Sequence, residues 1–139
     1  MNQINQNAVV YVTDLGFLTV SCLSLASALK ASPNSRFDCF LILVDVPETE
    51  IAKVRIYFEE MKKHVEVISI NSDVFKGLPS HSALPPTTYG RLIMDKFLPK
   101  HYQRVAYLDG DTTIKLDLNE LFDYELEGNT LGAVVEVGL

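Results

Sequence analysis

The feature of this sequence that most constrains its fold is a regular alternation between strand-like and helix-like segments. Four short runs rich in apolar and β-branched residues have the composition of buried strands: 8–13, 39–44, 65–70 and 104–108. Three segments between them repeat their apolar residues every three or four positions, the period of a helix: 18–29, 51–61 and 89–97. This alternation predicts an α/β fold in which helices flank a mostly parallel sheet.

The remaining segments carry weaker signals. Apolar and polar residues alternate over 114–118, which predicts a half-exposed strand, and 131–137 has the composition of a last strand. Residues 71–86 have no clean period and contain Gly77, three Pro residues and three Ser residues. We expect a long loop there, of the kind that often carries function, with His81 inside it. No repeat or linker divides residues 1–139, so we expect one domain.

Composition and charge argue against several classes of protein. The chain has 12 Lys and Arg residues against 18 Asp and Glu residues, a net charge of −6, which argues against general nucleic-acid binding. No apolar run approaches the roughly 20 residues of a membrane-spanning helix, and the amino terminus lacks the pattern of a signal peptide. Cys22 and Cys39 lie inside apolar segments, as expected for core thiols in a reducing compartment. We therefore expect a soluble, cytoplasmic protein.

Two polar clusters follow predicted strands, where ligands bind in parallel α/β sheets: Thr13-Asp14 and Asp109-Gly110-Asp111. In an extended chain Asp109 and Asp111 project to the same side, and their carboxylates repel unless a cation or proton lies between them. Such oxygen ligands suit Mg²⁺ or Mn²⁺, with substrate phosphates completing the coordination. The Asp-Gly dipeptide is also typical of a tight hairpin turn, and the spacing alone leaves both interpretations open.

Three further side chains have a functional and a structural interpretation, which the residues alone leave open. Asp14 can accept hydrogen bonds from a base or ribose, or can cap a turn. Phe17 can stack on a base, or can belong to the core. Arg91 can pair with a phosphate or with one of the aspartates, or can lie at the surface. The glycines form no dinucleotide-binding or P-loop pattern, and no GxSxG or Cys/His pairing indicates a covalent hydrolase.

The chain resembles glycosyltransferase family 8, a group of retaining enzymes that includes the glycogenins and bacterial lipopolysaccharide galactosyl- and glucosyltransferases. The resemblance rests on VTDLGF at 12–17, TTYGRL at 87–92, RVAYLDGDT at 104–112 and DLNELF at 117–122, which agree with the family in order and spacing. It covers nearly the whole chain. It implies a GT-A fold, which is a Rossmann-like sheet that binds a nucleotide-sugar, usually a UDP-sugar.

The resemblance also implies roles for individual residues. Asp109 and Asp111 would hold Mn²⁺ or Mg²⁺ against the diphosphate, and Arg91 would lie against the donor and these carboxylates. Phe17 takes the place of an aromatic residue that stacks on uracil. The expected nucleotide-binding residues are Val12, Thr13, Asp14, Phe17, Arg91, Leu108, Asp109 and Gly110; the expected catalytic residues are Arg91, Asp109 and Asp111.

The activity implied by the resemblance is transfer of a hexose from a UDP-sugar to an acceptor hydroxyl of a glycan, a lipid-linked molecule or a protein. Family members run well beyond 139 residues, and their later part supplies a histidine ligand and the acceptor site. We therefore expect this chain to be the N-terminal, nucleotide-sugar-binding portion, truncated at the C-terminus. Glu136 stands where relatives usually carry an aspartate.

Other interpretations remain open at this point. The chain can be a non-catalytic remnant that binds a nucleotide-sugar, or a subunit that needs a partner or additional C-terminal sequence. A partner chain or self-association would then cover the last strand. A signalling module of the receiver type, with clustered aspartates, is an alternative from another class.

Overall fold

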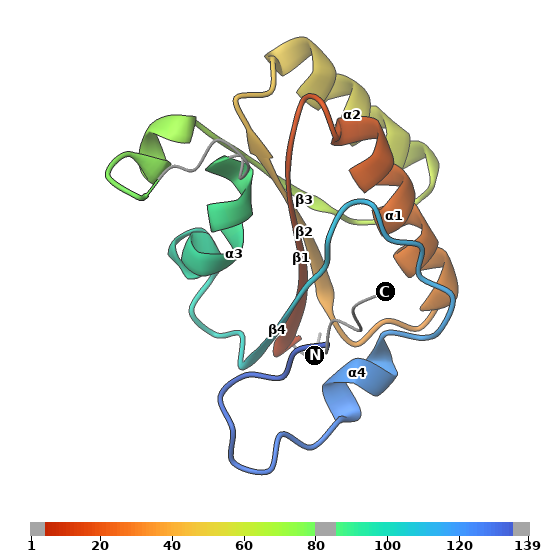
Figure 1. The fold of residues 1–139 in the computed structure, drawn as a ribbon. Helices are drawn as coiled ribbons and strands as arrows, with labels where there is room; N and C mark the ends of the chain where they lie inside the picture. The colour runs from red at the N-terminus through yellow and green to blue at the C-terminus, as the bar shows by residue number, and fades with distance from the viewer. Residues whose placement is uncertain (1–4, 80–85, 135–139) are drawn as a thin grey trace, which may run out of the picture.

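The computed structural model describes residues 5–79 and 86–134. Its centre is a parallel sheet in which the strands are ordered β3-β2-β1-β4 (Figure 1). The strands have the following bounds: β1 Asn7–Asp14, β2 Asp38–Val44, β3 Glu66–Ile70 and β4 Arg104–Tyr107. The expected α/β class and the four expected strands up to residue 108 are confirmed.

Helices cover both faces of this sheet (Figure 1). α1 (Leu18–Ala31) and α2 (Glu48–Glu60) lie on one face, because each of them connects two adjacent parallel strands. The other face is covered by the 3₁₀ turn η1 (Ser72–Phe75) and by α3 (Gly90–Ile93). A short helix, α4 (Asn119–Asp123), follows β4. Within the described residues no helix has the length and apolar character needed to cross a membrane.

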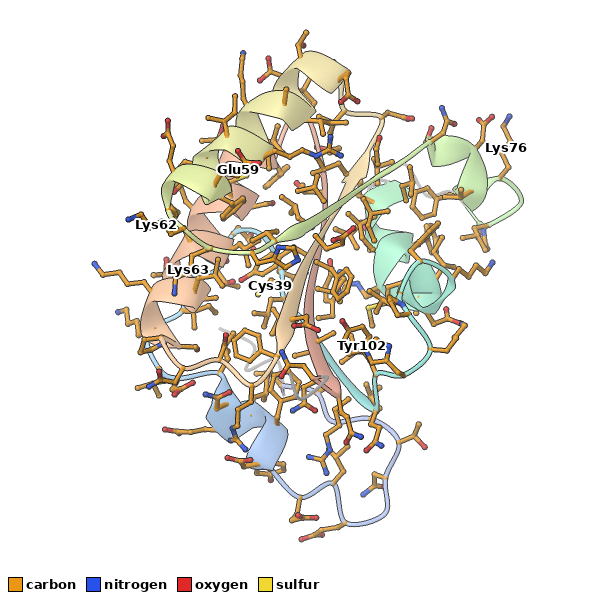
Figure 2. All side chains as sticks on the ribbon, turned by 180° about the vertical axis from the view of Figure 1, so that it is seen from behind. Cys39, Glu59, Lys62, Lys63, Lys76 and Tyr102 are labelled. Atoms are coloured by element: carbon orange, nitrogen blue, oxygen red, sulfur yellow. The ribbon has the colours of Figure 1, made fainter. Side chains whose placement is uncertain are left out.

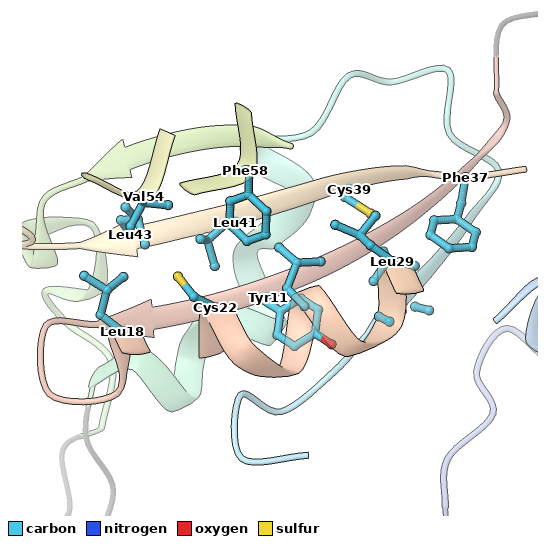
Figure 3. Packing of buried hydrophobic residues seen from close by; sticks show 14 of the residues in the cluster. Tyr11, Leu18, Cys22, Leu29, Phe37, Cys39, Leu41, Leu43, Val54 and Phe58 are labelled. Carbon is cyan, nitrogen blue, oxygen red and sulfur yellow. The ribbon is translucent and has the colours of Figure 1, made fainter. Parts of the chain in front are cut away.

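The core has one layer on each face of the sheet, because successive side chains of a strand point to opposite faces. Val9 and Tyr11 of β1 pack with α1 and α2 in the first layer, part of which Figure 3 shows. Val10 and Val12 pack in the second layer, beneath α3. All four side chains are buried, as expected for a central parallel strand.

Both cysteines belong to the first layer of the core (Figure 3). Cys22 on α1 and Cys39 on β2 are free and buried, which confirms that they are core residues. Burial raises the pKa of the Cys22 thiol to about 11 and the pKa of the Cys39 thiol to about 12. Because thiolates are the reactive form, both groups are inert near neutral pH.

The segment 114–118 is not the half-exposed strand that its alternation predicts. Two of its backbone N–H groups bond to serine hydroxyls, one in α1 and one directly after α1, instead of to another strand. The Ile114 N–H donates to Ser27 Oγ over 2.9 Å, and the Leu118 N–H donates to Ser32 Oγ over 2.9 Å. These small hydroxyl side chains let the segment run beside α1 and satisfy donors that a strand would pair in a ladder. Figure 1 shows this segment passing over α1.

The prediction of a last strand over 131–137 is also wrong for the residues of it that the structure describes. Residues 131–134 contain no strand and are exposed. Leu131 and Val134 are therefore apolar without being buried, which a sequence pattern does not distinguish from a buried strand. The rest of that prediction, including Glu136, lies outside the described residues.

The single helix predicted over 89–97 is instead three short pieces: η2 (Pro86–Tyr89), α3 and η3 (Met94–Lys96). Gly90 lies near the middle of this region and weakens a continuous helix. Ile93 is buried as predicted, but Leu92 is exposed, so the apolar stripe does not all face the sheet. His81 and the rest of 80–85 lie outside the described residues.

Candidate functional site

The candidate site lies where the order of strands reverses. The chain builds outward from β1 to β2 and β3, and then returns to add β4 on the other side of β1. The carboxyl ends of β1 and β4 are thus neighbours from which the chain departs in different directions. Ligands of open α/β sheets bind at such a switch point. Both polar clusters found in the sequence, at 13–14 and 109–111, lie at this edge.

The acidic segment after β4 is a turn and not an extended chain. The Asp109 carbonyl accepts hydrogen bonds from the Thr112 N–H over 3.3 Å and from the Thr112 hydroxyl over 2.7 Å. The Thr112 hydroxyl lies 3.0 Å from Ser24 Oγ of α1. The expectation of a turn is therefore right. The expectation of a hairpin is wrong within the described residues, since no strand follows β4 up to residue 134.

Gly110 allows this turn to lie directly against α1. A Cβ atom on Gly110 would lie 3.0 Å from Ser21 Cβ and still closer to Ser21 Oγ. The Ser21 hydroxyl in turn donates to Thr13 Oγ1 at the end of β1, over 2.9 Å. The acidic turn, the start of α1 and the end of β1 are thus held together by small residues and hydroxyl contacts.

Arg91 of α3 lies beside the acidic turn. Its Nη2 atom is 3.6 Å from Asp109 Oδ1, and its Nε–H donates to the Thr88 carbonyl over 3.2 Å. The guanidinium carbon lies 5.1 Å from the centroid of the Tyr107 ring. The structure therefore brings together Arg91 and Asp109, two of the residues that the sequence singled out. The side chains of Arg91 and Asp109 are 45% and 55% exposed, so both remain accessible to a ligand.

Tyr107 is a member of this site that sequence reasoning missed. Burial raises its pKa to about 12, and the nearby Asp109 and Asp111 carboxylates raise this pKa as well, whereas Arg91 lowers it. The phenol therefore stays neutral at physiological pH and lies near both carboxylates. The signal that could have identified it is its place two residues before Asp109, since alternate residues of a strand share a face.

The residues at and just after the end of β1 differ in how far their side chains are exposed. Val12 and Thr13 have buried side chains, so a ligand can meet mainly their backbone. Asp14 Oδ1 accepts a hydrogen bond from the Phe17 N–H over 3.2 Å, which is the turn-capping arrangement. Phe17 is 57% exposed, so the interpretation of Phe17 as a core residue is wrong. Leu108 is partly buried against the first core layer.

The acidic turn supplies two carboxylates and no larger set. Among the described residues, no three His, Cys, Asp or Glu side chains gather where they could hold a metal ion. Two open cavities, of about 240 and 440 Å³, lie elsewhere, at the amino end of β3. Figure 2 labels Glu59 and Lys63 of the first, and Cys39 and Tyr102 of the second. Neither of these two cavities is lined by a residue of the acidic turn.

The strand order, the switch point and the acidic turn after β4 define an α/β protein of the GT-A class. The model of glycosyl transferase family 8 matches residues 8–138. The chain belongs to this family. Family membership excludes the receiver-like signalling module considered above.

Curated relatives are lipopolysaccharide hexosyltransferases. The lipopolysaccharide 1,3-galactosyltransferase of Salmonella typhimurium (strain LT2) is 31% identical over 134 residues, which cover 94% of this chain and 39% of the relative. The lipopolysaccharide glucosyltransferase WaaO of Escherichia coli (strain K12) is 28% identical, with 94% and 38% covered. The chain thus spans less than half the length of these relatives.

Solved structures with the same fold include two of LgtC. An active-site mutant of LgtC has a TM-score of 0.79 and 25% identity, over 93% of this chain and 46% of LgtC. The galactosyltransferase LgtC in complex with donor and acceptor sugar analogues has a TM-score of 0.73 and 23% identity, over 86% of this chain and 43% of LgtC. The expected GT-A fold is thereby confirmed.

Proposed function

We propose that this chain is the nucleotide-sugar-binding part of a metal-dependent glycosyltransferase, which transfers a hexose from a UDP-sugar to an acceptor hydroxyl with retention of configuration. The observation that carries the proposal is the distance of 3.6 Å between Arg91 Nη2 and Asp109 Oδ1. Asp109 belongs to the acidic turn, which lies at the switch point of a family 8 fold. One cation and two carboxylates at an open edge suit a diphosphate and its counter-ion. We propose that residues 1–139 belong to one domain.

The relatives support the substrate class. The curated relatives are named as galactosyl- and glucosyltransferases of lipopolysaccharide, and LgtC has been crystallised with analogues of a donor and an acceptor sugar. A hexose donor fits all of them. The acceptor in our proposal is a glycan, lipid-linked molecule or protein with a free hydroxyl, and of these the relatives favour a lipid-linked glycan.

The acidic turn fits a divalent cation. Asp109 and Asp111 are exposed and offer only oxygen ligands, which suit Mn²⁺ or Mg²⁺ better than softer metals. Two protein carboxylates leave coordination positions for phosphate oxygens. A cation bound there would supply positive charge to the diphosphate as the bond to the sugar breaks.

The protein side chains would bind and orient the donor. Arg91 would donate hydrogen bonds to phosphate oxygens from beside Asp109, since its Nη2 atom lies too far from the carboxylate for a hydrogen bond. The exposed Phe17 ring would stack on uracil. Asp14, whose Oδ1 atom caps the turn, keeps Oδ2 for the ribose or the base. The surface beneath the nucleotide would be formed by Val12, Thr13, Leu108 and Gly110, of which Val12 and Thr13 have buried side chains.

Calorimetric titration of UDP tests this proposal. We expect binding in the presence of Mn²⁺ and its loss when EDTA removes the metal, because the two carboxylates and the diphosphate need a shared cation. Absence of binding in both conditions, from a sample that circular dichroism shows to be folded, would contradict the proposal. Binding without transfer to any acceptor would favour the alternative of a non-catalytic subunit, and restoration of transfer by added C-terminal sequence or a partner would favour an enzyme.

Phe17→Ala should weaken the binding of UDP more than that of Mn²⁺. Phe17 is exposed directly before α1, and base–aromatic stacking is worth about 1–3 kcal/mol per base. Leu23→Ala is the matched control, since Leu23 is an apolar residue of α1 whose exposed fraction, 60%, is close to that of Phe17. Calorimetry with UDP and with Mn²⁺ alone measures both affinities. Equal losses of both in Phe17→Ala would argue that Phe17 supports the fold and not the base.

A further inference from the structure

We propose that Tyr107 is a positioning residue, whose ring holds the Arg91 guanidinium beside Asp109 so that it can meet the donor diphosphate. The inference rests on the proposed function, because it assigns to Tyr107 a role in the same site. Tyr107 would contact neither metal nor nucleotide in this role. It would act through Arg91.

The placement of Tyr107 is fixed by the sheet. Tyr107 is the last residue of β4 and pairs in register with Val10 of β1, in the centre of the fold. Its ring packs against the second core layer and is only partly exposed. Tyr107 packs with the second core layer and Asp109 lies beside Arg91 of α3, so both lie on the side of the sheet that α3 covers.

Arg91, in contrast, has few contacts of its own. It stands on α3, which has four residues, and its side chain is nearly half exposed. Three contacts orient it: the Thr88 carbonyl, the Tyr107 ring and Asp109. A long side chain that is free to rotate loses entropy when it binds a ligand, so a contact that fixes it beforehand improves binding.

The ring is the part of Tyr107 that matters. A guanidinium within about 6 Å of an aromatic centroid is attracted by the negative face of the ring, and here the separation is 5.1 Å. The contact leaves the Nη2 group of Arg91 available to a ligand, because the Asp109 carboxylate is 3.6 Å away from it and not hydrogen-bonded, while the Nε–H is bonded to the Thr88 carbonyl. The cation is thus held in place without being neutralised by a tight ion pair.

The test compares UDP with uridine, which has no phosphate. Tyr107→Leu should weaken the binding of UDP with Mn²⁺ by about two- to fivefold, the fold-change expected from a partly exposed cation–π contact, and leave the binding of uridine unchanged. Tyr107→Phe should bind UDP as the natural chain does. NMR titration measures both ligands, and Tyr57→Leu, on the partly buried Tyr57 of α2, is the control for loss of a tyrosine elsewhere.

A double-mutant cycle with Arg91→Gln tests whether Tyr107 acts through Arg91. In the Arg91→Gln background, Tyr107→Leu should have no further effect on the affinity for UDP. The same loss in both backgrounds, or an equal loss of uridine binding, would overturn the inference. If Tyr107→Leu does not fold, Tyr107→Ile, which suits a strand, takes its place. Failure of the unmutated chain to bind UDP would overturn the proposed function itself. Measuring the unmutated chain beside the variants therefore distinguishes failure of the proposed function from failure of the inference about Tyr107.

Discussion

Asp109→Asn and Asp111→Asn are each expected to abolish the Mn²⁺-dependent binding of UDP while leaving the protein folded. An amide offers one neutral oxygen where a carboxylate offers two charged ones, so the turn loses half of its negative charge with either substitution. Both side chains are exposed on a turn outside the sheet. The contact of Asp109 with Arg91 is an exposed ion pair, and such pairs stabilise proteins by about 1 kcal/mol at most.

Calorimetry with UDP and Mn²⁺ checks the loss of binding, and thermal unfolding followed by circular dichroism checks the fold. Asp95→Asn is a matched control, because Asp95 is an exposed aspartate whose only ion pair in the described residues is with Lys100. It should bind UDP normally. Unfolding of either acidic-turn variant would show that the carboxylates support the structure. Unchanged binding in both would place the metal elsewhere.

The central sheet could be predicted from the sequence because its signals are local and strong. Residues 8–12 and 39–44 are apolar without interruption, a composition typical of short strands buried on both faces. The change to a helical period at Leu18 placed α1 correctly, since Leu18, Cys22, Leu25 and Leu29 are all buried. Alternation of these elements then leaves few arrangements besides a parallel sheet.

The segments after β4 could not be predicted because their structure depends on distant residues. Ile114 and Leu118 have the spacing of a strand, but their N–H groups bond to Ser27 and Ser32, more than 80 positions earlier. Nothing in a local pattern indicates that acceptors on a helix replace a neighbouring strand. The serines of α1 are small enough to permit close packing, but their size does not indicate which segment packs there.

The site was predicted in part, by two different routes. Spacing alone left the Asp-Gly-Asp segment open between a turn and a metal site, and the structure contains the turn, with Asp109 beside Arg91. The family resemblance suggested the closeness of Arg91 and the acidic segment, which are separated by 18 positions. Neither route identified Tyr107, because its contact with the Arg91 guanidinium depends on where α3 places that side chain. Contacts between side chains of different elements need the fold before they can be recognised.

Gly90→Ala is expected to destabilise the protein and to weaken UDP binding at the same time. A Cβ atom on Gly90 would lie 2.9 Å from Val12 Cβ, 3.0 Å from Cγ2 and closer still to Cγ1. β1 is a central strand and cannot move aside, so α3 must shift away from the sheet. Overpacking of this kind costs about 1–3 kcal/mol, which exceeds the gain of at most about 1 kcal/mol from replacing a helical glycine with alanine. Arg91 follows directly and would move away from Asp109.

Val12→Ala in the same chain should relieve most of this clash, because it removes both Cγ atoms and leaves only the Cβ atom, at 2.9 Å. Alone, Val12→Ala loses two buried methyl groups, about 1.5 kcal/mol. In the Gly90→Ala background it should cost much less or be stabilising, so that the two substitutions are coupled by about 0.5–3 kcal/mol. Chemical denaturation of the four variants in the cycle measures the coupling, and UDP titration shows whether Arg91 returns. If the costs simply add, α3 does not rest on Val12, and the placement of Arg91 by the glycine beside it would be wrong.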